Sequence, residues 1–423
     1  MKTYFNSVGW NGYQNDFWQG LSEELPTAGQ FYIDISRRLN PNRLVRRSPA
    51  QWSIPFDQAV WPGYIMPEFK PGTKITFADA TDHRAKEISK LVQSGQKFVV
   101  MYSGGIDSTV IMCALIKNLT AEELSHISVC ASAASIVNNP LFWERFIHGK
   151  FNVIDSSNHK YDDLVNLGFT PISGDTGDCL FGTTFGSHLY YNWRRYLDNN
   201  SSLSQANIES KIKSFTDPNV HFSVFKDLLI TYFAIPKKQG FPYVALAQPN
   251  ANFGELFYNK LDLHAKTSPV PINSLHDFFW WYMFDLKYIN CAVRGLIYYN
   301  DSLDIKTLSS QFIDWYTTDL YQQWAMNNNN NSTKIVYTNA TYKKVARDYI
   351  FDLDHNPWYY YFKLKIENVG LMFNKQSVDH LPIKKRPNAR VGVTEDFDVL
   401  YIDQPLVQDY LRSSLENYKI DWQ

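Results

Sequence analysis

The sequence has no apolar run long enough to cross a bilayer, since the longest, residues 278–284, is far shorter than the ~20 residues of a spanning helix. Its 4 cysteines are widely spaced, and the lack of a CxxC pair argues against an iron–sulfur or zinc site and fits a reducing compartment. Neither sign of charge dominates, because 41 basic residues face 42 acidic ones, which argues against nucleic acid or a membrane as partner. The N-terminus, MKTYFNSVGW, has no signal-peptide core, so a cytoplasmic protein is expected.

The sequence does contain a regular alternation of apolar runs and helical patterns. Strands are expected at 97–102, 126–131, 151–154 and 170–173. Helical patterns begin at Thr81, Val110 and Pro140, and a short one covers Tyr161–Leu167. Strands that alternate with helices predict an α/β fold, with a parallel sheet that has helices on both faces.

The regions on either side of this alternation differ from it. Residues 1–80 are rich in Trp, Tyr, Pro and Gly, which predicts a small irregular or β-rich segment. Residues 81–190 form the expected α/β core, and residues 191–423 are expected to form a mostly helical region. The aromatic run Phe278–Tyr282 is expected to pack between helices rather than to line a substrate pocket.

A loop with two glycines, Ser103-Gly-Gly-Ile-Asp-Ser-Thr109, lies between the expected strand 97–102 and the next helix. Glycines at such a place let backbone N–H groups close on an anion, and the helix N-terminus adds partial positive charge. Neither of two common phosphate-binding patterns, GxxxxGK[ST] and GxGxxG, occurs in the chain. Because Asp107 would be repelled by phosphates, the loop predicts a cation between them, and Mg²⁺ is the natural choice.

The stretch SGGIDS resembles the SGGxDS signature of the PP-loop ATP pyrophosphatase superfamily, whose members cut ATP between its α and β phosphates. A second stretch, Ile172-Ser-Gly-Asp-Thr-Gly-Asp-Cys-Leu-Phe-Gly182, is similar to the SGEGSDELFGG motif of the asparagine synthetase and β-lactam synthetase branch. The resemblance covers residues 97–190 well and the C-terminal region loosely. It implies an adenine nucleotide alpha hydrolase-like fold that uses ATP and Mg²⁺.

The resemblance also implies site residues. It assigns Mg²⁺ to Asp107 and Asp178. Asp178 taken alone would be interpreted as a helix N-cap, and the presence of the first motif favours metal binding. The residues that it assigns to ATP are Ser103, Gly104, Gly105, Asp107, Ser108, Thr109, Met101, Val129, Ser173 and Gly174.

The second stretch departs from the family pattern at several positions. Asp175, which is assigned to catalysis, stands where the family usually has Glu, and Gly177 replaces the family's Ser. Cys179 also stands where the family has Glu, which puts that residue's role in question. A cysteine near a helix start is either reactive or a small packed residue.

Lysines near the C-terminus are candidates for stabilising the pyrophosphate leaving group. Residues 339–350 resemble a family helix that reads K-x-x-x-R, and Tyr359–Lys365 follows it. Lys363 and Lys365 are favoured over Lys343, and Lys384–Arg386 is a weaker candidate. These lysines would serve equally well to solvate a helix face.

Asparagine synthetase begins with a catalytic cysteine, whereas Lys2 stands at that position in this chain, and about a hundred residues precede the loop. We therefore expect no glutaminase domain, and an amine or free ammonia as the nucleophile.

The sequence predicts an amide-forming ligase that adenylates a small-molecule or peptide carboxylate. Two alternatives stay open: a PP-loop enzyme that thiolates or amidates a nucleobase or tRNA, and a degenerate nucleotide-binding subunit without catalysis. A homodimer also stays open.

Overall fold

The structure of this protein is a computed structural model. It describes the following residues: 66–156, 159, 161–182, 223, 226–227, 255, 258–259, 262–288, 311–328, 343–356, 359–360, 390–393 and 400–403. The chain divides into two compact units. One, called the sheet unit below, comprises 74–177, 295–324 and 342–423; the second unit comprises 1–73, 178–294 and 325–341. Most of the predicted N-terminal segment, residues 1–65, lies outside the described residues.

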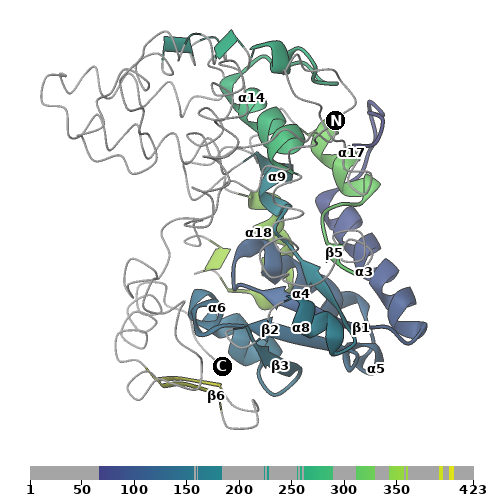
Figure 1. The fold of residues 1–423 in the computed structure, drawn as a ribbon, viewed down its shortest axis with the longest axis vertical. Coiled ribbons are helices and arrows are strands. Elements are labelled where there is room, and N and C mark those ends of the chain that lie inside the picture. The colour runs from purple at the N-terminus through teal and green to yellow at the C-terminus, as the bar shows by residue number, and fades with distance from the viewer. Residues whose placement is uncertain are drawn as a thin grey trace, which may run out of the picture. The chain divides into compact units, whose positions relative to one another are not determined.

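The sheet unit is built on five strands in the order β3-β2-β1-β4-β5. Figure 1 labels β1, β2, β3 and β5 of this sheet. Their bounds are β1 Lys97–Tyr102, β2 Ile127–Ala131, β3 Asn152–Asp155, β4 Phe169–Ser173 and β5 Ile313–Asp314. All neighbouring pairs are parallel. The α/β class and the four predicted strands are therefore confirmed. The fifth strand, β5, was not predicted, because two residues carry no recognisable strand pattern.

Helices and two further strands complete the described parts of the chain. The helices are α3 Phe77–Gln93, α4 Ile106–Asn118, α5 Ala121–Leu124, α6 Ala133–Asn138, α7 Pro140–Phe142, α8 Tyr161–Asn166, α9 Gly177–Phe181, α14 Leu275–Trp281, α17 Asp319–Asn327 and α18 Lys344–Asp354. Two π-helices, η2 Trp143–Ile147 and η5 Tyr282–Lys287, continue α7 and α14. An antiparallel pair is formed by β6 Arg390–Val393 and β7 Leu400–Asp403. No described helix is both long and apolar enough to span a membrane.

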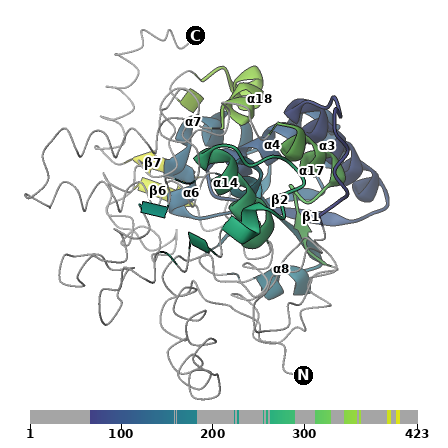
Figure 2. The same cartoon turned by 90° about the horizontal axis from the view of Figure 1, so that it is seen from above.

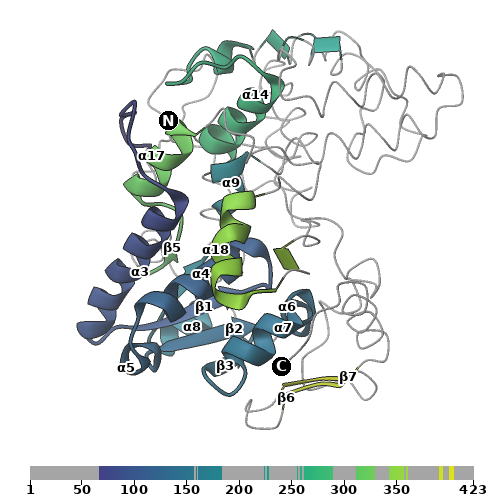
Figure 3. The ribbon, with the colours of Figure 1, turned by 180° about the vertical axis from the view of Figure 1, so that it is seen from behind.

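Helices cover the sheet, because its strands carry apolar side chains that are stabilised by burial. Val99 of β1, Cys130 of β2 and Ile154 of β3 form a cluster with Leu164 of α8. Helices α3 and α4 contact each other (Figure 2), and α18 contacts both of them (Figure 3). Buried apolar side chains thus extend from the sheet into the helix layers around it.

The first of these helices, α3, is fixed by a capping box. The Thr76 hydroxyl accepts a hydrogen bond from the Asp79 backbone N–H at 3.0 Å, and the Asp79 carboxylate accepts one from the Thr76 N–H at 3.1 Å. This cap sets the start of the helix at Phe77, four residues before the start at Thr81 that the apolar pattern predicts.

In the second unit, the aromatic residues of α14 are buried. Trp280 donates a hydrogen bond from Nε1 to the Leu180 carbonyl at 3.2 Å, and Trp281 donates one to the His264 carbonyl at 3.0 Å. Both tryptophan side chains are fully buried. The prediction that the 278–282 run packs inside the protein is confirmed for Phe278, Trp280, Trp281 and Tyr282, which are buried.

Candidate active site at the carboxyl ends of β1 and β4

The Ser103–Thr109 loop leaves the carboxyl end of β1 and enters α4 at Ile106, as predicted. Hydroxyl groups hold its shape. The Ser103 N–H donates to Ser108 Oγ at 3.1 Å, and Ser108 Oγ donates to the Gly105 carbonyl at 3.2 Å. Gly105 is the N-cap of α4 and makes no side-chain capping bond. The loop therefore presents the start of a 13-residue helix, whose first N–H groups favour an anion.

Gly104 is required by packing as well as by conformation. Its φ of 65° lies in the left-handed region, which favours glycine. A Cβ atom there would lie 2.0 Å from the Ser135 carbonyl oxygen and 2.7 Å from Asn138 Cβ. The Asn138 side chain donates a hydrogen bond to the Ser103 carbonyl at 2.9 Å, which connects α6 to the loop.

The predicted metal ligand Asp107 forms an ion pair with Lys343. The lysine Nζ lies 2.6 Å from Oδ1 and 2.5 Å from Oδ2 of the carboxylate. The Lys343 side chain is 1% exposed, whereas that of Asp107 is 22% exposed. Loss of the Asp107 carboxylate would remove a negative charge from beside the buried Lys343 ammonium, which would destabilise the fold.

The second motif lies directly against this carboxylate. It follows β4, which pairs in parallel with β1, so both loops leave the same edge of the sheet, as the sequence predicts. A Cβ atom at Gly177 would lie 2.4 Å from Asp107 Oδ1 and 2.9 Å from Tyr316 Cε2. A Cβ atom at Gly174 would lie 3.3 Å from Asp107 Cβ. Gly177 thus occupies a position where a side chain would collide with the carboxylate of Asp107.

Residues of β5 and the turn after it support the second loop, and sequence reasoning missed them. Thr176 donates a hydrogen bond to the buried carboxylate of Asp314. Tyr316 donates from its hydroxyl to the Asp107 carbonyl at 3.0 Å, and the Trp315 N–H donates to the Ser173 carbonyl at 2.8 Å. No local signal identifies these residues, because their strand is too short to show a pattern.

A buried tyrosine contacts the first loop from the other direction. The Tyr359 hydroxyl donates to the Gly104 carbonyl at 3.2 Å and lies 3.3 Å from Thr109 Oγ1. Burial raises the pKa of Tyr359 well above its ordinary value, so the phenol is neutral and can donate. The Tyr359 N–H donates in turn to the Asn356 side chain at 3.2 Å.

A carboxylate at the end of α18 belongs to the same buried region. Desolvation raises the pKa of Asp354 to about 7, although the Asn356 N–H bond and Arg145 oppose the shift. Arg145 donates to the Asp354 carbonyl at 2.6 Å, and the Asn356 N–H donates to its Oδ1 at 2.9 Å. Asp354 is 2% exposed. A raised carboxyl pKa is common at functional sites, and networks of hydrogen bonds and ion pairs that only stabilise the fold produce one as well. The pKa of Asp354 therefore does not by itself assign it a role.

The remaining predicted residues of the second motif have varied positions. Ser173 is buried, and its hydroxyl accepts a hydrogen bond from the backbone N–H of Asp175 at 3.2 Å. Asp175 is half-buried. Asp178, which is also half-buried, lies in the first turn of α9. It follows Gly177 in the chain but belongs to the second unit. Cys179 is fully buried, which supports the packed rather than the reactive alternative.

Two predicted nucleotide-binding residues face the interior. Val129 is fully buried in the middle of β2, where it pairs with Val100. Met101 is partly buried and packs against the Val99 cluster. Lys363, Lys365 and Lys384–Arg386 lie outside the described residues, so Lys343 is the predicted lysine that the structure places at the loop.

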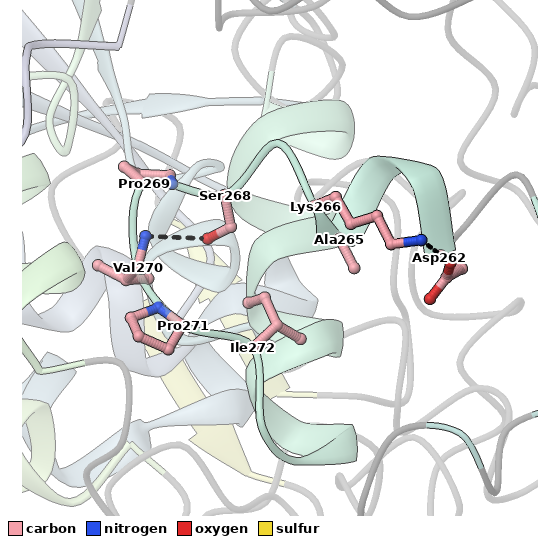
Figure 4. A pocket seen from close by; sticks show the side chains of 8 residues that line it. All are labelled: Asp262, Ala265, Lys266, Ser268, Pro269, Val270, Pro271 and Ile272. Carbon is pink, nitrogen blue, oxygen red and sulfur yellow. Dashed lines mark hydrogen bonds and ion pairs between the residues drawn. The ribbon is translucent and has the colours of Figure 1, made fainter.

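The second unit contains a separate pocket of about 460 Å³ (Figure 4). Its lining residues are Asp262, Ala265, Lys266, Ser268, Pro269, Val270, Pro271 and Ile272. The two charged side chains form an ion pair with each other at 2.6 Å. None of the predicted site residues that the structure describes is among the lining residues.

Comparisons with protein-family models, curated proteins and solved structures find no match to this chain. Within the described residues, no three His, Cys, Asp or Glu side chains come together as a ready-made metal site. The candidate site therefore rests on the two loops, their glycines and the Asp107–Lys343 ion pair.

Proposed function

We propose that this protein is an ATP-dependent, AMP-forming amide ligase of the asparagine synthetase-like kind, with a PP-loop fold. The contact between the two loops carries the proposal. Asp107 of the SGGIDS loop lies against Gly174 and Gly177 of the second motif, at the carboxyl ends of adjacent parallel strands. This edge is where open α/β sheets bind ligands. Two motifs from separate stretches of sequence thus meet at one place.

The proposed reaction has two steps. A substrate carboxylate oxygen attacks the α phosphorus of ATP, the bond to the β-phosphate oxygen breaks, and pyrophosphate leaves with that electron pair. An amine then attacks the acyl carbon, loses a proton and expels AMP, which leaves an amide. The chain contributes position and charge: the start of α4 and the hydroxyl of the exposed Ser103 would bind phosphate oxygens, while Ser108 holds the shape of the loop.

The proposed cation is Mg²⁺, which is usually bound by one or two carboxylates together with phosphate oxygens. Asp107 offers both carboxylate oxygens, and Asp178 is the second proposed ligand. Bound Mg²⁺ would neutralise charge on the phosphates. In the described structure Lys343 holds both oxygens of Asp107, so a cation and this lysine require the same atoms.

The identity of the lysine that stabilises the departing pyrophosphate is part of the proposal. Lys363 and Lys365 remain the candidates from sequence, and Lys343 joins them because its ammonium already lies at the loop. Such an ammonium would offset the charge that develops on the leaving group.

The test is product analysis with ATP labelled at the α or γ phosphate, Mg²⁺, and a pool of carboxylates and amines. Formation of AMP and pyrophosphate would support the proposal, whereas ADP and phosphate would contradict it. Asp107→Asn should reduce the rate by about 10³-fold or more, because the metal site and the charge balance of the loop are both lost. Asp352→Asn, at an exposed position on α18, should leave the rate unchanged.

A nucleotide-binding subunit without turnover is a second candidate, because Lys343 neutralises the carboxylate that catalysis would need. Binding of ATP with no product of either kind, for the whole pool, would favour this second function.

A further inference from the structure

The Asp107–Lys343 ion pair occupies the carboxylate oxygens that a bound cation would also need. One ammonium contacts both carboxylate oxygens, at 2.6 and 2.5 Å. A divalent cation bound to either oxygen would therefore lie within a few ångströms of the buried ammonium. Two positive charges that close repel each other, and the burial of Lys343 limits how far water screens them. The carboxylate can hold the lysine or the cation, but not both without a large cost.

The backbone at Lys343 shows that this arrangement is strained. Its φ of 46° and ψ of 41° place it in the left-handed region, immediately before α18. His355, at the other end of α18, has a φ of 49°, and these two are the non-glycine residues with positive φ in the described parts of the chain. Such a conformation costs about 1 kcal/mol or more for a residue with a Cβ atom. Lys343 thus makes the ion pair from a backbone conformation that is unfavourable for a residue with a side chain.

The helix behind the lysine is anchored independently of Asp107. Tyr349 donates a hydrogen bond to Asp82 of α3, and Arg347 donates to the Tyr360 carbonyl at 2.6 Å. Lys344, the neighbour of Lys343, forms its own ion pair with Asp348 at 2.8 Å. Movement of the Lys343 ammonium away from Asp107 therefore leaves these contacts of α18 in place.

We propose that Lys343 is an internal counter-ion that competes with a divalent cation for the carboxylate of Asp107. The lysine neutralises Asp107 while no cation is bound, and cation binding displaces it. This competition lowers the apparent affinity of the site, and by linkage the bound cation weakens the ion pair to the same degree. The inference rests on the proposed function only in that Asp107 binds a metal. It adds that the chain itself regulates access to that site.

The test is titration with Mn²⁺ alone, followed by its paramagnetic resonance signal, in the full-length protein. Lys343→Gln should bind Mn²⁺ about tenfold or more tightly than the wild type. Lys343→Arg, which keeps the charge, should stay within a few-fold of the wild type. Adding Asp107→Asn to Lys343→Gln should abolish the gain. Lys344→Gln is the matched control, since it removes a lysine charge one residue away, and its affinity should equal that of the wild type.

Unchanged or weaker Mn²⁺ binding by a folded Lys343→Gln variant would overturn the competition. A second measurement uses the wild-type protein and does not depend on how the variant folds. Acetylation of the Lys343 amine, followed by mass spectrometry, should increase severalfold when Mn²⁺ saturates the protein, whereas acetylation of Lys344 should not change. Protection of Lys343 that persists at saturation would refute the proposal. Neither readout needs ATP turnover, so failure of the ligase assay and failure of the competition are separate results.

Discussion

A methyl group added at Gly104 would collide with the Ser135 carbonyl, whereas one added at Gly149 would meet nothing within 4 Å. The two glycines have almost the same φ, 65° and 67°. Gly149→Ala should therefore cost only the conformational penalty, about 1–2 kcal/mol. Gly104→Ala should cost about 1–3 kcal/mol more, because the Ser135 backbone must move. Urea unfolding of both variants measures the difference, and equal losses would mean that the loop can move away from α6.

At the scale of single residues, the sequence predicted the first loop correctly in position and context. It placed Asp107 at the start of a helix after a strand, because the SGGIDS pattern is local. The lysine was harder to identify, since the sequence patterns favour Lys363 and Lys365 over Lys343. The contact between Lys343 and Asp107 spans 236 residues of sequence. A lysine that pairs over such a distance, from a left-handed position, leaves no periodic signal that could reveal it.

Glu123 connects two helices, and its effect belongs to the scale of elements. It accepts hydrogen bonds from Ser89 and Gln93 of α3, at 2.6 and 2.8 Å, and from the Thr120 N–H. The Ser89 bond, the Thr120 bond and the Gln93 bond lower the pKa of Glu123 to about 2. The charged form is thus favoured by folding, and this stability is lost as the pH falls from about 4.5 towards 2.

Glu123→Gln should accordingly reduce the slope of unfolding free energy against pH over that acid range. Urea midpoints measured between pH 2 and 5 give the slope. Glu122→Gln, at the exposed neighbouring position, is the control and should keep the wild-type slope. A wild-type slope in the Glu123 variant would show that the α3–α5 contact does not depend on this charge.

Asp354 should produce a pH dependence of the opposite sign. Its pKa is raised to about 7 by desolvation, so folding disfavours the charged form and the stability contribution decreases as the pH rises from about 4 to 7. Asp354→Asn keeps an oxygen for the Asn356 N–H and removes the titration. The stability of this variant relative to the wild type should increase across that interval, as measured by urea unfolding. Asp352→Asn should show no such trend.

Strands were easier to predict than helix geometry. The apolar runs gave β1 to β4 to within a residue, because a buried parallel strand is apolar throughout. The pattern that begins at Pro140 is helical, but it passes from α7 into the π-helix η2 after three residues. A π-helix differs from an α-helix by one residue per hydrogen-bonded ring, and the spacing of apolar residues does not record that change.

At the scale of the whole molecule, the division into two compact units predicts two unfolding events. Each unit has a capped helix that can report on it. Thr76 caps α3 in the sheet unit, and the Ser274 hydroxyl accepts a hydrogen bond from the Asp277 N–H at 3.1 Å in the second unit. Thr76→Ala and Ser274→Ala should each remove about 1 kcal/mol, and each from its own transition. Calorimetry separates the two, and a single transition lowered by both variants would contradict independent units.

The sequence indicated the α/β core because that core is nearly continuous in the chain. The parts that it missed come from far away: β5 joins the sheet beside β4, and Thr176 and Asp314 are 138 residues apart. Composition after residue 190 is dominated by helical and aromatic patterns, which conceal a two-residue strand. Long-range partners of this kind are set by tertiary packing rather than by local preference.

The distance in sequence between β4 and β5 has a consequence for synthesis of the chain. A ribosome releases the segments of β1 to β4 well before residues 313–314, and domains begin to fold as they emerge. Until then β4 is an open sheet edge, and unpaired edges of this kind attract other strands. The second loop also lacks Asp314 and Tyr316 during that interval. Nascent chains of this protein should therefore depend on chaperones most strongly while the segment between β4 and β5 is being made.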